Sequence, residues 1–348
     1  MKKNSVISVI IAVAMIALGF ALVLFSHSRG ENALSFFKSG VDFSVGGGSI
    51  GFGADQKGYT VCLSGEERFD PAEVKSLDLD WISGSVSVEP WDGDAVLVRE
   101  KADKPLTEGQ RLRWKLSGGE LSVLFCADGE TRVPDKALTV LVPRGMGLKA
   151  IDADAVSAPV TLLEQTVSGA IDADTTSGAV TLRGCACRSL DVDTVSGAVS
   201  VEATAVSGAI DLDSTSGKLA LAAVSCASFD ADTVSARVEA EALAVGMDLD
   251  IDSTSGAVTL RALAVGGEVD AGTMSGRVEL RFESLPASVN VDTGSGAVTL
   301  AFPKGTALDL DYDSASGRLS GAFSSVRGGL PVDVSTVSGN LTIEEDQC

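Results

Sequence analysis

Ten copies of one short motif, spaced almost evenly, dominate the distal part of the chain. Each copy has the form DxDx(T/S)xSG or a close variant, and its serine recurs every 19 to 22 residues. A constant period of this length is typical of proteins built from stacked repeats. The motif serines are Ser157, Ser177, Ser196, Ser216, Ser235, Ser255, Ser275, Ser295, Ser316 and Ser338.

Within each repeat, apolar and polar residues alternate on both sides of the serine. Apolar residues stand six and four positions before it, as Ile171 and Ala173 do before Ser177. A valine or leucine follows three residues after it, as Val180 does. Strict alternation interrupted by small residues predicts two short strands per repeat, joined at a tight corner.

Two all-β folds could use this unit: an antiparallel meander of hairpins or a β-solenoid. The position-matched columns favour the solenoid, with about 20 residues per coil, because only there do equivalent residues of successive repeats become neighbours about 4.8 Å apart. A second corner is expected nine residues before each serine, where residues are small or turn-forming. These residues are Ser168, Cys187, Ser207, Cys226, Gly246, Gly266, Pro286, Ala307 and Gly329.

Composition excludes several function classes. The 348 residues include 48 acidic and 27 basic side chains, which gives a formal charge of −21, so binding to nucleic acid through phosphate neutralisation is not expected. A single histidine, His27, excludes metal and nucleophile sites that need converging imidazoles. The few aromatic residues predict a narrow interior filled by aliphatic side chains.

The N-terminus predicts membrane attachment. Residues 5–25 carry no charge and would extend about 31 Å as a helix, enough to cross the hydrocarbon core. A cleavable signal peptide is the alternative, but the run is long for one and has no A-x-A site. Lys2 and Lys3 favour a cytoplasmic stub at residues 1–4, so the protein is expected to be a single-pass membrane protein with its C-terminal part extracellular.

Three further regions follow the predicted anchor. Residues 26–70 are expected to form a juxtamembrane linker, and their G-x-S-x-G match at 47–51 has neither the strand–helix context nor the base of a hydrolase elbow. Residues 71–147 contain a diverged strand–SG–strand unit at Ser83 and predict an irregular cap on the solenoid. Residues 148–348 contain the regular coils.

Two columns of aspartates are the main candidate site. They stand five and three positions before the serine and include seventeen aspartates, whose stacking would cost about 0.9 kcal/mol per neighbouring pair at the dielectric constant of water. The carboxylates could be hydrated on an outward face, partly protonated, or bridged by Ca²⁺, which prefers six to eight oxygen ligands. No cofactor is required, and the Ca²⁺ candidates are Asp152, Asp154, Asp172, Asp174, Asp191, Asp193, Asp211, Asp213, Asp230, Asp232, Asp250 and Asp252.

The alternative function is that of a parallel β-helix enzyme, a glycan hydrolase or lyase, acting through surface Asp pairs. Such enzymes build a cleft from long loops, whereas these coils carry almost no insertions. The same pair in nearly every coil therefore indicates a structural role, and no catalytic residue is assigned.

Six cysteines allow few disulfides. Cys187 and Cys226 are predicted to lie two coils apart, beyond disulfide reach. Cys185 and Cys187 alone are too few for a metal site. Cys62 and Cys126 form a possible pair, and Cys348 ends the chain.

The chain from about Lys75 to Cys348 resembles the bacterial "putative adhesin" β-strand-repeat family, a domain of unknown function in Gram-positive envelope proteins. The resemblance is carried by Leu79–Glu89, by Leu138–Gly145 and by the repeated SG strands up to Ile343. It implies an adhesin-like or envelope-stress-related surface protein without a reaction. The expected partners are the membrane, through residues 5–25, and a protein, peptide or glycan ligand.

Overall fold

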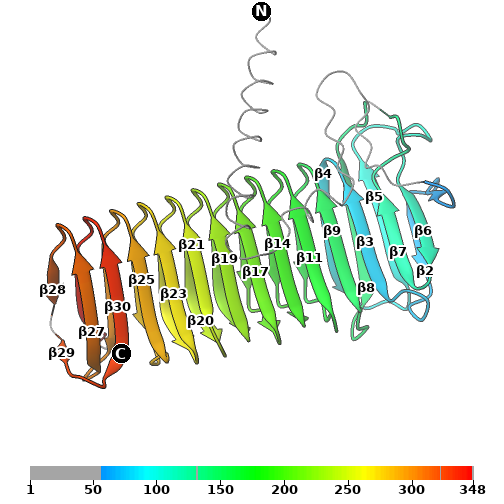
Figure 1. Ribbon diagram of the computed structural model, residues 1–348. Helices are drawn as coiled ribbons and strands as arrows, with labels where there is room; N and C mark the ends of the chain where they lie inside the picture. Colours follow the sequence, from blue (N-terminus) through cyan, green and yellow to red (C-terminus); the bar gives the residue numbers. More distant parts are fainter. Residues whose placement is uncertain (1–55, 131, 322, 347–348) are drawn as a thin grey trace, which may run out of the picture.

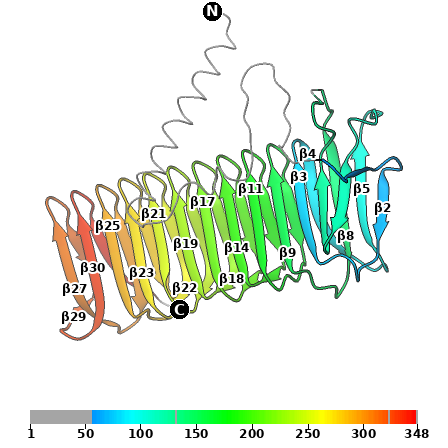
Figure 2. The ribbon, with the colours of Figure 1, turned by 45° about the vertical axis from the view of Figure 1, so that its right-hand side comes forward.

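The computed structural model describes residues 56–130, 132–321 and 323–346, and these form an all-β solenoid (Figures 1 and 2). Each coil adds one strand to each of two parallel sheets, as predicted from the repeat. The predicted anchor at residues 5–25 and most of the predicted linker lie outside the described residues. No helix within the described ranges is long and apolar enough to cross a membrane.

The first sheet, called sheet A, contains the strands that precede the SG corner. Its fifteen strands lie in the spatial order β1 (Thr60–Val61), β6 (Arg113–Ser117), β7 (Glu120–Leu124), β3 (Ser76–Trp81), β9 (Ala150–Ala155), β11 (Ala170–Thr175), β14 (Ser189–Thr194), β17 (Ala209–Ser214), β19 (Ser228–Thr233), β21 (Leu249–Ser253), β23 (Glu268–Thr273), β25 (Ser288–Thr293), β30 (Leu330–Thr336), β27 (Ala307–Ser314) and β29 (Ser324–Ser325).

The second sheet, called sheet B, contains the strands that follow the corner. Its order is β2 (Glu66–Phe69), β5 (Val96–Ala102), β8 (Lys136–Pro143), β4 (Gly84–Trp91), β10 (Val160–Leu163), β12 (Val180–Arg183), β15 (Val199–Glu202), β18 (Leu219–Cys226), β20 (Val238–Val245), β22 (Val258–Val265), β24 (Val278–Phe282), β26 (Val298–Pro303), β31 (Leu341–Asp346) and β28 (Leu319–Gly321), with β13 (Ala186–Cys187) and β16 (Ala205–Val206) beside this path.

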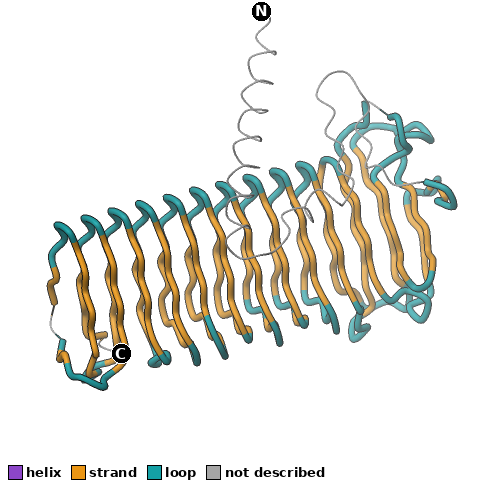
Figure 3. The backbone as a smooth tube through the Cα atoms, viewed as in Figure 1, coloured by secondary structure: helices purple, strands orange, loops and turns teal. Residues whose placement is uncertain are grey.

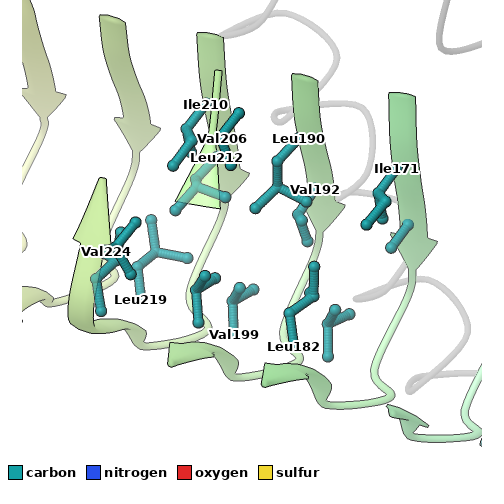
Figure 4. Packing of buried hydrophobic residues seen from close by; sticks show 14 of the residues in the cluster. Ile171, Leu182, Leu190, Val192, Val199, Val206, Ile210, Leu212, Leu219 and Val224 are labelled. Carbon is teal, nitrogen blue, oxygen red and sulfur yellow. The ribbon is translucent and has the colours of Figure 1, made fainter. Parts of the chain in front are cut away.

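The core is the space between the two sheets. Figure 4 shows aliphatic side chains of sheet A, such as Ile171 and Leu190, gathered with Leu182 and Val199 of sheet B. These four residues are at most 1% exposed. Burying one such side chain stabilises the fold by about 1.5–3 kcal/mol. Each coil buries apolar side chains at equivalent positions, so each coil adds a similar contribution.

The corner between the sheets is closed by a buried ladder of hydroxyl groups. Thr194 Oγ1 accepts a hydrogen bond from the amide of Gly197 at 2.8 Å, and Thr175 Oγ1 donates to the carbonyl of Gly178 at 2.8 Å. A Cβ on Gly197 would lie 1.9 Å from the carbonyl oxygen of Gly178. Glycine is therefore favoured because successive coils approach most closely here.

A third short wall closes the coils on the side opposite the SG corner (Figure 3). The second corner lies where the sequence predicts it, with bends at Ser168, Ser207, Gly246 and Gly266. Cys187 and Cys226 are the last strand residues before the bend in their coils, and both side chains are buried. Cys187 pairs with Val206, and Cys226 with Val245, in one inward column. Sheet B turns into this wall at residues with positive φ, which are Glu164, Gly184, Ala203, Ala223, Ala242 and Ala262.

At both ends the spatial order of coils departs from chain order. At the C-terminal end, β30 lies between β25 and β27, and β31 lies between β26 and β28 (Figure 1). At the other end, β3 and β4 pair with β9 and β10, while β7 and β8 fold back outside them. Equivalent residues therefore stack in register, as expected, but the last coil of the chain is not the last of the stack.

Side-chain size explains the position of the last coil. β30 and β31 present Val332, Val334, Leu341 and Ile343 inward, which matches the pattern of the other coils. β27 and β28 place the large Tyr312 and the side-chain-free Gly321 at two equivalent positions. This coil pairs in register with β30 and β31 on one face, and the mismatch in side-chain size at Tyr312 and Gly321 disfavours a further coil on the other.

Candidate functional site

The aspartate columns form two continuous rows on the outer face of sheet A. Parallel pairing places Asp172 beside Asp191 in one row and Asp174 beside Asp193 in the other, and neighbouring strands are about 4.8 Å apart. The residues that alternate with these aspartates along the strand, Ile171 and Ala173, point into the core. The predicted outward carboxylate rows are therefore present.

The rows extend beyond the regular repeats at one end. β3 adds Asp78 beside Asp152 and Asp80 beside Asp154. The outer row then contains eight consecutive aspartates, Asp78, Asp152, Asp172, Asp191, Asp211, Asp230, Asp250 and Asp270, and the inner row seven, Asp80, Asp154, Asp174, Asp193, Asp213, Asp232 and Asp252. In the sequence, Asp78 and Asp80 belong to the diverged unit around Ser83. This unit lies far upstream of the regular repeats, so the spacing of the motif alone does not assign the two residues to the rows.

At the other end the rows are interrupted. Gly272 follows Asp252 in the inner row, and Asn290 follows Asp270 in the outer row. The Asn290 amide nitrogen lies 3.3 Å from a carboxylate oxygen of Asp270, so it can donate a hydrogen bond there. Carboxylate crowding is thus greatest between β3 and β21.

Crowding and partial burial change the acidity of the inner row. Desolvation raises the pKa of Asp193 to about 9, with additional contributions from the charges of Asp213 and Asp174. Desolvation together with Asp78 and Asp154 raises the pKa of Asp80 to about 8. At neutral pH these two carboxyl groups are therefore mostly protonated, which is one of the three expected ways to relieve the repulsion.

The charge of the solenoid is segregated between its faces. None of the sheet A strands from β9 to β30 contains a lysine or an arginine. On the sheet B side stand Arg183, Lys218, Arg237, Arg261 and Arg281, interspersed with glutamates. Sheet A is therefore an acidic face, and sheet B is a face of mixed charge.

The rows do not assemble a compact metal cluster. In the described ranges, no group of three or more His, Cys, Asp or Glu side chains is arranged to hold a metal ion. Paired rows offer carboxylates from neighbouring coils without the surrounding carbonyl oxygens that complete a Ca²⁺ site. Calcium binding by Asp152 to Asp252 remains an expectation from the sequence.

The cysteines are free thiols. Cys62, Cys126, Cys185, Cys187 and Cys226 are buried and unpaired in the described part of the chain. Strand β6 separates the segments that carry Cys62 and Cys126, because β1 and β7 pair with its opposite edges. Burial raises the pKa of the Cys226 thiol to about 12, so these cysteines act as core residues.

A buried ion pair lies inside the N-terminal cap, a feature that the sequence did not reveal. Lys136 Nζ lies 2.7 Å from Glu100 Oε1, and both side chains are at most 1% exposed. The ammonium group also donates to the carbonyl oxygens of Gln110, at 2.7 Å, and Phe125. It stands over the rings of Phe125 and Trp81, with the nitrogen 4.3 and 5.0 Å from the ring centroids. This pair ties β5, β8 and two loops together.

A shallow groove of about 510 Å³ lies on sheet B, across β18, β20, β22 and β24. Its floor is made of small residues, including Ala220 and Ala257, and its walls carry arginines and glutamates. It does not overlap either aspartate row. The glycan-enzyme alternative, in which a cleft surrounds one Asp pair, therefore gains no support from this groove.

Comparisons with known proteins agree with the sequence resemblance. Two solved structures align over most of the chain: a "putative cell adhesion protein" from Clostridium sporogenes (9% identity, 81% of this chain and 98% of that one, TM-score 0.23) and a "putative adhesin" from Bacteroides fragilis (9% identity, 80% and 95%, TM-score 0.28). Comparison with curated proteins gives no match. The family model described as Toastrack DUF4097 matches residues 74–265 and 186–344, which together span most of the chain and both ends of the stack, so the protein belongs to the Toastrack DUF4097 family.

Proposed function

We propose that the protein is a non-catalytic, membrane-anchored envelope protein whose sheet A is an acidic docking surface for a cationic partner outside the cell. The observation that supports this role is the pair of continuous aspartate rows on strands that contain no basic residue. A flat surface of one sign attracts the opposite charge from a distance and can accelerate association. Adhesion and envelope-stress sensing would both use such a surface.

Charge variants test the surface. Replacing Asp172, Asp191 and Asp211 by asparagine should weaken binding of a lysine-rich peptide and reduce its salt dependence, because three charges of one row are removed. The matched control replaces three exposed glutamates on the sheet B side by glutamine: Glu202 in β15, Glu241 in β20, and Glu283 directly after β24. Titration calorimetry at low and physiological salt measures both variants, and an equal loss in the two would contradict a sheet A site.

Anchoring is tested separately. With residues 5–25 deleted, the protein should leave the membrane fraction, whereas the intact chain should remain there until detergent is added. Protease added to intact cells should cleave the C-terminal part of the anchored protein. Intact C-terminal domains under conditions that degrade a known surface protein would contradict an extracellular location.

A further inference from the structure

The groove on sheet B contains a gap between two arginines. The residue before each sheet B strand points outward, and in three successive coils it is Arg237, Ala257 and Arg277. The amides of Val238 and Val258 donate to the carbonyls of Ala257 and Arg277, so the three residues stack in register. The two arginine backbones are therefore about 9.6 Å apart, with only a methyl group between them.

The central part of the groove lies directly beside this gap. Thr259 is two residues beyond Ala257 on β22, so its side chain shares the outer face with that of Ala257. In-register pairing places Glu239 on one side of Thr259 and Glu279 on the other. The gap thus has an arginine at each end and a hydroxyl group along one side.

Each of the two glutamates is paired with two basic side chains, and one of these four is Arg237. Glu239 pairs with Lys218 at 2.5 Å and with Arg237 at 3.4 Å, and these contacts lower its pKa, the Lys218 hydrogen bond most strongly. Glu279 pairs with Arg281 at 2.8 Å and with Arg261 at 3.6 Å, and the Arg281 hydrogen bond is the largest cause of its lowered pKa. Each carboxylate is ionised and held between two basic side chains.

Around the groove, basic side chains outnumber carboxylates by one. The groove and its ion-pair partners contain five basic side chains, Lys218, Arg237, Arg261, Arg277 and Arg281, against four carboxylates, Glu239, Glu241, Glu279 and Glu344. Arg277 is exposed and makes no ion pair with any residue that the structure describes. In a protein with a formal charge of −21, this is a local excess of positive charge.

From this geometry we infer that the gap over Ala257 is a binding site for a tetrahedral oxyanion, a phosphate or sulfate group. Arg237 and Arg277 both line the groove and stand on opposite sides of the gap, and planar guanidinium groups donate paired hydrogen bonds to such anions. Thr259 supplies a hydroxyl donor from a third direction. The acidic rows of sheet A repel anions, so an anionic envelope polymer would meet the protein through this face.

The site is independent of the proposed acidic surface, because it lies on the other sheet. Binding of inorganic phosphate and of a short polyphosphate is measured by titration calorimetry at low ionic strength. Arg277→Gln should weaken phosphate binding about tenfold or more, because it removes a charge-assisted donor pair. Ala257→Glu should abolish binding, because it fills the gap with a carboxylate that pairs with both arginines.

The matched control is Arg183→Gln. Arg183 is exposed on the same sheet, but its in-register neighbours are Leu163 and Glu202, so it has no second arginine across a gap. Its loss should leave phosphate affinity within about twofold of the original. Tighter binding of polyphosphate than of phosphate would identify a polymer as ligand, and similar affinities would identify a single anion.

Three results would overturn the site. These are no binding of either probe by the intact protein, equal losses in Arg277→Gln and Arg183→Gln, and unchanged binding in an Ala257→Glu variant whose thermal unfolding matches that of the original protein. Neutralising Asp172, Asp191 and Asp211 should not weaken phosphate binding, so failure of this site and failure of the acidic docking surface are distinguishable.

Discussion

At the scale of single residues, each aspartate in the rows differs mainly in its neighbours. Asp193 lies between Asp174 and Asp213 in the inner row. Asp292 occupies an equivalent position between Gly272 and Ser335, neither of which carries a charge. An aspartate at this position of the repeat therefore has two acidic neighbours along its row in one coil, and none in another.

This contrast predicts the effect of removing one charge. Asp193→Asn should stabilise the protein by at least about 1–2 kcal/mol at pH 8. The folded state has to protonate this half-buried carboxyl between two acidic neighbours, whereas the unfolded chain ionises it, and asparagine removes that cost. Asp292→Asn should change stability by less than about 0.5 kcal/mol. Urea denaturation measures both, and a larger gain for Asp292→Asn would contradict the crowding account.

The direction of the pKa shifts predicts the pH dependence of stability. Asp80 and Asp193 have pKa values of about 8 and 9 in the fold, above the ordinary value of 3.8. Folding therefore takes up protons, so stability should rise as pH falls from about 9 toward 4. The melting temperature followed across this range measures the effect. In Asp193→Asn the rise should be smaller, and a melting temperature that falls between pH 8 and pH 5 would refute the expected sign.

A second contrast concerns backbone strain at the bend of sheet B. Ala223 has a φ of 54°, a left-handed conformation that costs a residue with a Cβ about 1–2 kcal/mol. Ala223→Gly should release this strain but lose about 0.4–1 kcal/mol through the greater freedom of the unfolded chain, for a net gain of about 0.5 kcal/mol.

The control is Ala220→Gly, which changes the same residue type in the same strand, β18, at a position without positive φ. It should destabilise by about 0.5–1 kcal/mol. Urea midpoints of the two variants are compared. Equal losses in both would show that the bend carries no strain.

At the scale of elements, the buried Lys136–Glu100 pair links two antiparallel neighbours of the cap, β8 and β5, and ties them to the loops of Gln110 and Phe125. Lys136→Met should cost about 3–5 kcal/mol, because the buried Glu100 would lose the ammonium group at 2.7 Å and keep only the guanidinium of Arg111, 3.9 Å away. Thermal unfolding should show the cap melting earlier, and hydrogen exchange in β5 and β8 should accelerate.

A double variant separates charge from packing. Adding Glu100→Gln to Lys136→Met removes the stranded carboxylate and should restore more than half of the loss. A double variant that is less stable than Lys136→Met alone would show that the pair acts by packing and not by charge compensation.

At the scale of the whole molecule, the order of coils decides which residues lie inside. Leu341 follows Leu319 in the chain, yet Leu341 is fully buried between two coils and Leu319 is 41% exposed at the end of the stack. Stacking in chain order would give the opposite pattern.

Matched truncations test this order. Leu341→Ala should cost about 2–5 kcal/mol, the range for a buried leucine, and Leu319→Ala less than about 1 kcal/mol. Chemical denaturation measures both, and hydrogen exchange should show stronger protection in β31 than in β28. Equal costs, or a larger one at Leu319, would indicate stacking in chain order.

Local patterns predicted a large part of this architecture. The 20-residue period, the alternation around Ser177 and the column of aspartates established a parallel solenoid with a carboxylate-bearing face, because stacking in register follows directly from equivalent residues in equivalent positions. The same patterns did not reveal the third wall at Cys187 and Val206, since its buried column contains valine, cysteine and polar neighbours without a clear alternation.

By itself, the sequence therefore determined the coil, its two main strands and the side of each strand that faces the core. Tertiary structure alone decided the order of the terminal coils, the Lys136–Glu100 pair and the arginine gap over Ala257. The physical reason is that every repeat presents nearly the same stacking surface. The repeat therefore specifies that coils stack in register, but it does not specify which coil stacks on which. The choice among them depends on a few large or missing side chains, such as Tyr312 and Gly321, and on contacts between residues far apart in the chain.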